Sequence, residues 1–67
     1  MIKNKIGENA GLIWNILNEK GELPISKLVK LAQIDNNNFY MALGWLAREG
    51  KIDSYEKDDK QMVQLIH

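Results

Sequence analysis

No cysteine occurs in this 67-residue chain, so neither a disulfide nor a thiolate metal site can hold its fold together. A chain of this size buries only about 60% of the surface that it exposes when unfolded, which leaves little stability to spare. Its only histidine, His67, is the last residue, whereas a structural metal site needs about four ligands. We therefore expect no metal. The remaining sources of stability are a closely packed core and dimerisation.

Apolar residues recur at helical spacing in the N-terminal part of the chain. Their intervals of three or four residues predict an amphipathic helix from about Lys5 to Glu19. Asn4 is its expected N-cap, and Gly21 is its expected stop. The members of this apolar stripe are Ile2, Ile6, Ala10, Ile13 and Leu17.

Gly7 and Gly11 lie one turn apart in this helix, on the side that carries Trp14. Each costs about 1 kcal/mol relative to alanine in a helix interior. Two interpretations stay open: the helix begins only at or just after Gly7, or another backbone approaches closely here. Trp14 on one flank of the stripe, and Leu12 and Ile16 on the other, widen the apolar arc beyond what one core face needs.

A short strand and a second helix are expected next. Proline cannot donate to a β-ladder, so Leu23–Ile25 is expected to be an edge strand. Ser26 is the expected cap of the second helix. Residues 33–35 break that helix in a helix-turn-helix connection, with Ile34 as the buried residue of the turn. The apolar residues of the second helix are Leu28, Val29, Leu31 and Ala32.

The third helix is expected to begin at a cap formed by Asp35 or Asn36, to run to Glu49 and to stop at Gly50. Residues 51–57 and 61–66 are predicted to be two strands around a hairpin loop at Asp58–Asp59. The order is helix, short strand, helix, helix, strand, strand, which is that of a mainly α, winged helix-turn-helix domain covering residues 1–67. The residues expected to form its core are Phe39, Ala42, Leu43 and Leu46 with Ile13, Leu17, Leu28 and Leu31.

Two stretches of sequence, IGENAGLIW at residues 6–14 and FYMALGWLAREGKI at residues 39–52, carry a resemblance. Together they resemble a family of small prokaryotic winged helix-turn-helix proteins, stand-alone domains of mostly unassigned function. The second stretch is the more specific, and the resemblance covers essentially the whole chain. It implies the fold strongly and DNA binding only by analogy, because function belongs to sites and not to folds.

In a DNA-binding winged helix, the third helix enters the major groove. Helical geometry turns Asn37, Met41, Gly44 and Arg48 outward when Phe39 faces the core. The run at residues 36–38 has two interpretations, because asparagine bonds adenine edges and also caps helix starts. The residues expected to contact DNA are Asn36, Asn37, Asn38, Tyr40, Met41, Arg48, Lys51, Lys57 and Lys60.

Nine basic and nine acidic side chains cancel, which removes the simplest argument for nucleic-acid binding. A firm DNA binder neutralises about 6–10 phosphates, so a monomer would bind weakly and we expect a homodimer.

Tryptophan and methionine are enriched at protein–protein interfaces. Trp45 has a second interpretation, in which it packs against the wing strands as part of the core. The expected interface residues are Leu12, Trp14, Ile16, Met41 and Trp45.

The residue inventory excludes the common kinds of active site. There is no internal histidine or cysteine, no glycine-rich phosphate loop and no serine paired with a base, so we expect no enzyme, no cofactor and no small-molecule substrate. The carboxylates of residues 53–59 lack the spacing of a calcium loop.

The apolar run Leu12–Trp14 is too short to span a membrane, and no signal-peptide pattern is present. We therefore expect a cytoplasmic protein.

The sequence therefore favours a dimeric, DNA-binding transcriptional regulator. The alternative is a winged-helix module for protein–protein interaction or dimerisation that does not bind nucleic acid. Convergence of the cations of the third helix and the wing with Asn37 and Asn38 on one exposed face would favour DNA binding. A subunit interface at Met41 and Trp45 would instead occupy that face.

Overall fold

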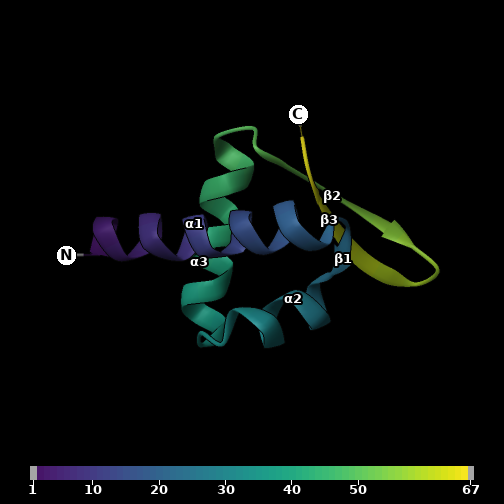
Figure 1. Ribbon diagram of the computed structural model, residues 1–67, viewed down its shortest axis with the longest axis horizontal. Helices are drawn as coiled ribbons and strands as arrows, with labels where there is room; N and C mark the ends of the chain where they lie inside the picture. The colour runs from purple at the N-terminus through teal and green to yellow at the C-terminus, as the bar shows by residue number, and fades with distance from the viewer. Residues whose placement is uncertain (1, 67) are drawn as a thin grey trace.

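The computed structural model describes residues 2–66, with side chains from residue 5 onward. Figure 1 shows helix α1 crossing helix α3, with helix α2 below them and the hairpin of strands β2 and β3 projecting as a wing. The predicted mainly α, winged helix-turn-helix order of elements is confirmed. The elements are α1 (Ile2–Lys20), β1 (Leu23–Pro24), α2 (Ile25–Ala32), α3 (Asn36–Arg48), β2 (Ile52–Lys57) and β3 (Lys60–Leu65).

Helix α1 is longer than predicted and begins at Ile2. Asn4 lies inside it, so the prediction that Asn4 is the N-cap is wrong. Gly7 also lies inside the helix, so the interpretation that the helix begins there is wrong as well. The predicted stop is confirmed: Gly21 has a φ of 80°, which glycine adopts without steric cost, and its N–H donates to the Leu17 carbonyl at 2.8 Å.

Helix α2 begins without a side-chain cap. Its N-cap residue is Pro24, at a φ of −66° and a ψ of 146°, so the prediction that Ser26 caps the helix is wrong. The proline ring already restricts φ to this value, which lets the chain leave β1 and enter α2 without an intervening loop. Gln33 ends the helix in the left-handed region, at a φ of 57°.

Helix α3 begins at the predicted N-cap, Asp35. One carboxylate oxygen, Oδ2, accepts from the Asn38 backbone N–H at 3.3 Å, and Oδ1 accepts from the Asn38 side-chain Nδ2 at 2.5 Å. The helix ends at Arg48, one residue before the predicted end, and Gly50 follows at a φ of 69°. The main chain then leaves the helix and enters β2.

The three strands form an antiparallel sheet in the order β1-β3-β2, so β1 is at an edge, as its proline predicted. Lys57 pairs with Lys60 across the hairpin, so β2 ends at Lys57 as predicted and β3 begins at Lys60, one residue before the predicted start. Asp58 and Asp59 form the connecting turn, at φ values of 52° and 64°. Positive φ at both central residues is typical of the two-residue type I′ turn.

The core lies where α1, α2 and α3 meet one face of the sheet. The prediction that Leu31 belongs to the core is wrong, because its side chain is 38% exposed. Helix α2 is only two turns long and faces the core through Leu28 and Ala32, which leaves Leu31 on its flank. The sequence also did not indicate that Asn9 would be buried in α1, where its Nδ2 has no hydrogen-bond partner among the described residues. The buried members of the core are Ala10, Ile13, Leu17, Leu23, Leu28, Ala32, Phe39, Ala42, Leu43, Leu46, Ile52 and Val63.

Candidate functional site

The outer face of α3 is exposed and carries two apolar side chains. Tyr40 is 54% exposed and Met41 is 43% exposed. The Tyr40 ring packs edge-on against Phe39, with ring centroids 5.2 Å apart, so it is held at the surface by the core. Arg48 is the basic side chain of this helix, and it is exposed on the same face. The outer face therefore combines an apolar centre with one cation.

The three asparagines at the start of α3 do not share one role. The Asn38 side chain is half-buried and is bonded to the Asp35 carboxylate, so the capping interpretation explains this residue. Asn36 and Asn37 are exposed. The hydrogen bonds from Asn38 hold the pKa of the Asp35 carboxyl below its ordinary value. A carboxylate therefore stands at neutral pH at the end of α3 that would enter a DNA groove.

The two faces of the wing differ in charge. Side chains alternate between the faces along a strand and partners across an antiparallel pair share a face. The register pairs Lys57 with Lys60 and Tyr55 with Met62, so these residues share the face of the sheet opposite the one that carries the core residue Val63. Glu56 lies on the opposite face, which is the face that carries the core residue Val63.

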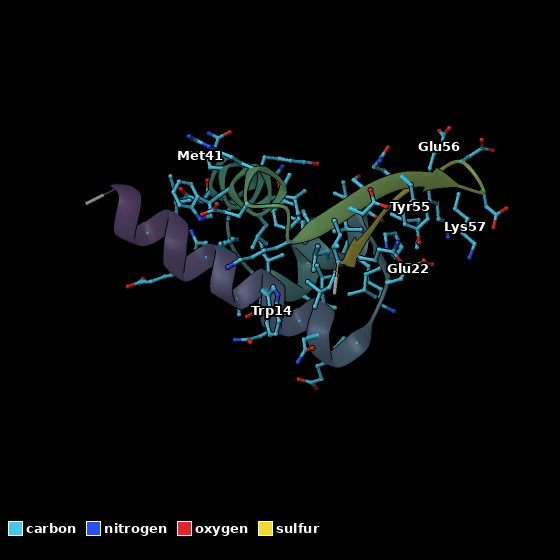
Figure 2. The ribbon with its side chains drawn as sticks, turned by 90° about the horizontal axis from the view of Figure 1, so that it is seen from above. Trp14, Glu22, Met41, Tyr55, Glu56 and Lys57 are labelled. Atoms are coloured by element: carbon cyan, nitrogen blue, oxygen red, sulfur yellow. The ribbon has the colours of Figure 1, made fainter. Side chains whose placement is uncertain are left out.

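Lys57, the lysine nearest the wing tip on β2, is turned away from α3. Its Nζ lies 3.6 Å from Oε1 of Glu22, the residue before β1. In Figure 2, Glu56 and Met41 project on the same side of the molecule, whereas Lys57 and Glu22 lie on the other side of the wing. The cations Lys57 and Lys60 thus do not converge with Arg48 and the exposed asparagines.

A groove of about 300 Å³ lies between α1 and the C-terminal half of α3. We call it the tryptophan groove, because Trp14 and Trp45 both line it and both are half-buried against the core. Trp45 therefore packs against the core, as one of its two interpretations predicted, and it also lines the groove that faces α1. The other lining residues are Gly7, Ala10, Gly11 and Asn15 from α1, Leu46 from α3 and Lys51 beyond it.

The five residues expected at a dimer interface do not form a single surface. Trp14 and Trp45 meet in the groove, and Ile16 is half-buried against the core. Leu12 is 39% exposed on α1. Met41 lies on the side of α3 that faces away from α1 and Trp14 (Figure 2). The structure thus separates an outer face of α3 from the tryptophan groove.

The family model described as "Winged helix-turn-helix domain (DUF2582)" matches residues 1–65. The chain belongs to this DUF2582 family. It is 42% identical over 64 residues to "Uncharacterized protein MJ1608" of Methanocaldococcus jannaschii, an alignment that covers 91% of this chain and 90% of that protein. The solution NMR structure of protein BT2368 from Bacteroides thetaiotaomicron matches with a TM-score of 0.84 at 32% identity, covering 97% of this chain and 79% of the other. The resemblance to a winged-helix family of unassigned function is confirmed.

Sequence reasoning found most of the surface residues of this DUF2582 domain but not the groove itself. Asn15 was not singled out, although it falls one turn after Gly11, and Lys51, which was expected at DNA, also lines the groove. Between residues 2 and 66, no helix is long and apolar enough to cross a bilayer. Over the same residues, no group of three metal-ligating side chains comes together.

Proposed function

We propose that this DUF2582 domain is a self-associating protein-interaction module, with a binding role and no catalytic one, and that its exposed surfaces contact protein. The observation that carries the proposal is the distribution of charge around α3. Where a DNA-reading helix needs flanking cations, α3 exposes Tyr40 and Met41 and has a carboxylate, Asp35, at its start. Exposed apolar side chains of this size are typical of protein interfaces.

DNA binding depends on how many cations a protein presents and on which side of the domain they lie. A firm DNA complex neutralises about 6–10 phosphates. Arg48 is the cation of α3, and Glu56 lies on the helix side of the wing, where it would repel a phosphate. Lys57 faces the other way and is already within 3.6 Å of a carboxylate. A neutral chain that spreads its cations in this way has little field with which to attract DNA.

Two measurements on the intact chain test the proposal. Sedimentation equilibrium across a range of concentrations is expected to show a mass that rises from 7.7 kDa toward that of a dimer. A fluorescence titration with mixed-sequence duplex DNA at low salt is expected to show no binding at micromolar protein. A mass that stays at 7.7 kDa at hundreds of micromolar, or DNA binding that weakens steeply with salt, would overturn the proposal.

The second candidate is the DNA-binding transcriptional regulator. One observation favours it: the outer face of α3 is exposed, and Asn36 and Asn37 are exposed on its first turn. A dimer would also double the cations offered to DNA. In this case Asn37→Ala would reduce discrimination between DNA sequences, whereas Arg48→Ala would weaken binding to all duplexes and flatten its salt dependence.

A further inference from the structure

We propose that the tryptophan groove is closed by helix α1 of a second copy of this chain. The two α1 helices run antiparallel across a two-fold axis, and they cross at Gly11. This inference rests on the proposed self-association and assigns it a site. Four features of the monomer support it: the glycines on α1, the two indoles, the accessibility of α1, and the charges at the ends of the groove.

The glycines of α1 are not required by packing within one chain. A Cβ built at Gly7 or at Gly11 would meet no heavy atom within 4 Å. Glycine nevertheless destabilises a helix interior relative to alanine, because it loses more backbone freedom on folding. A helix face without Cβ atoms allows a second backbone to approach closely. The contact that these glycines permit therefore has to come from outside the chain.

The groove also leaves aromatic surface to be covered. Trp14 and Trp45 are each half-buried, and the open volume between the helices is about 300 Å³. Figure 1 shows that the N-terminal turns of α1 extend beyond α3, and Gly7, Glu8, Gly11 and Leu12 of this helix are exposed. Large apolar side chains at the centre of an interface usually supply most of its binding energy.

Charge complementarity identifies a second copy as the occupant. The strip of α1 that faces the groove, formed by Gly7, Gly11 and Asn15, carries no charge, so two such strips can meet without repulsion. Lys51 is the charged side chain that lines the groove, and Glu8, which follows Gly7 in the chain, is exposed. Among residues 5–66 the ion pair that forms is Glu22–Lys57, which leaves Glu8 and Lys51 unpaired in the monomer.

The two-fold axis brings these unpaired charges together. Glu8 and Trp14 lie three positions on either side of Gly11. In the antiparallel crossing, Glu8 of one copy therefore faces Trp14 of the other, and we pair it with Lys51, which lines the same groove. Because a two-fold interface repeats every contact, both copies gain the same pairing between Glu8 and Lys51.

A charge-reversal cycle tests the pairing by sedimentation equilibrium at low salt. Glu8→Lys and Lys51→Glu, each alone, are expected to raise the dimer Kd by about tenfold, because each places like charges together at both ends of the interface. The double variant is expected to return the Kd toward that of the wild type. Single variants with unchanged Kd, or a double variant that associates no better than the weaker single one, would overturn the assignment.

A glycine pair provides the matched test of close approach. Gly11→Gln is expected to raise the dimer Kd by at least about tenfold, because its side chain would stand on the crossing point. Gly44→Gln makes the same change on the outer face of α3, where a Cβ also meets no atom within 4 Å, and is expected to leave the dimer Kd unchanged, because the groove assignment places self-association on α1 and leaves the outer face of α3 for other proteins. Circular dichroism checks that both variants are folded. A Gly11→Gln protein that dimerises like the wild type overturns the crossing.

The two proposals fail in different ways. A wild-type chain that remains monomeric at hundreds of micromolar overturns the proposed self-association and the groove assignment with it. A wild-type dimer that responds neither to charge reversal nor to Gly11→Gln overturns the groove assignment alone and leaves self-association in place.

Discussion

Asp35 illustrates how one side chain organises the start of a helix. Its carboxylate accepts two hydrogen bonds from Asn38, and these bonds lower its pKa from the ordinary value of 3.8. A group whose pKa is lowered by folding stabilises the fold above its unfolded pKa and loses that contribution as the pH falls through its folded pKa. The contribution of Asp35 to stability is thus present at neutral pH and lost below about pH 3.8.

The change Asp35→Ala is therefore expected to lower the Tm at pH 7, because the first turn of α3 loses its cap. The difference from the wild type is expected to shrink as the pH falls below 3.8 and through the lowered pKa of the folded wild type, because the carboxylate then becomes protonated and the cap is weakened. Thermal unfolding followed by circular dichroism at both pH values measures this. Asn37→Ala, in the same turn but outside the cap, is the control and should leave the Tm unchanged. An equal Tm loss at both pH values would contradict the account.

The hairpin turn places two acidic residues in a backbone conformation that favours glycine. Asp58 and Asp59 have φ values of 52° and 64°, and their like charges are adjacent. Replacing Asp59 by glycine is expected to raise the free energy of unfolding by about 0.5–1 kcal/mol, because Asp-Gly suits a type I′ turn. Chemical denaturation measures the change. Asp53→Gly, in the extended backbone of β2, should instead destabilise the protein, and a stability loss in Asp59→Gly would exclude a type I′ turn.

The core-facing side of α3 is the element on which the three helices meet. Leu43 is buried in it, whereas Leu31 on α2 is 38% exposed. Leu43→Ala is expected to cost about 2–5 kcal/mol, by lost transfer energy and a residual cavity. Leu31→Ala is expected to cost less than about 1 kcal/mol, because water already reaches that side chain. Denaturant midpoints compare the two variants, and equal losses would mean that the orientation of α2 differs from the one described.

The whole molecule has few ways to add stability, because it lacks cysteine and buries a small core. If two copies share the apolar surface of the tryptophan groove, mass action stabilises the folded state as concentration rises. The Tm is then expected to increase over a hundredfold range of protein concentration, as calorimetry can measure. Gly11→Gln should remove most of this dependence, and a Tm independent of concentration in the wild type would argue against association.

The order of the elements and most of the core followed from the sequence alone. The helical spacing of apolar residues, the positions of Gly21 and Gly50, and the cap at Asp35 are local features, and each acts through its own few neighbours in the chain. Predictions from the local sequence were wrong where a neighbouring element determined the cap or the burial of a residue. Pro24 made a cap at Ser26 unnecessary, and the short α2 left Leu31 outside the core.

The candidate site was decided by tertiary structure. The sequence supplied Trp14, Trp45 and the glycines of α1 as unusual residues, but only the crossing of α1 and α3 places them around one groove. It also supplied Lys57 as a wing cation, but the register with β3 sets the face on which that side chain lies, and a shift of one residue would reverse it. Helix crossing and strand register depend on contacts between residues far apart in the chain, and these contacts leave no periodic pattern in the sequence.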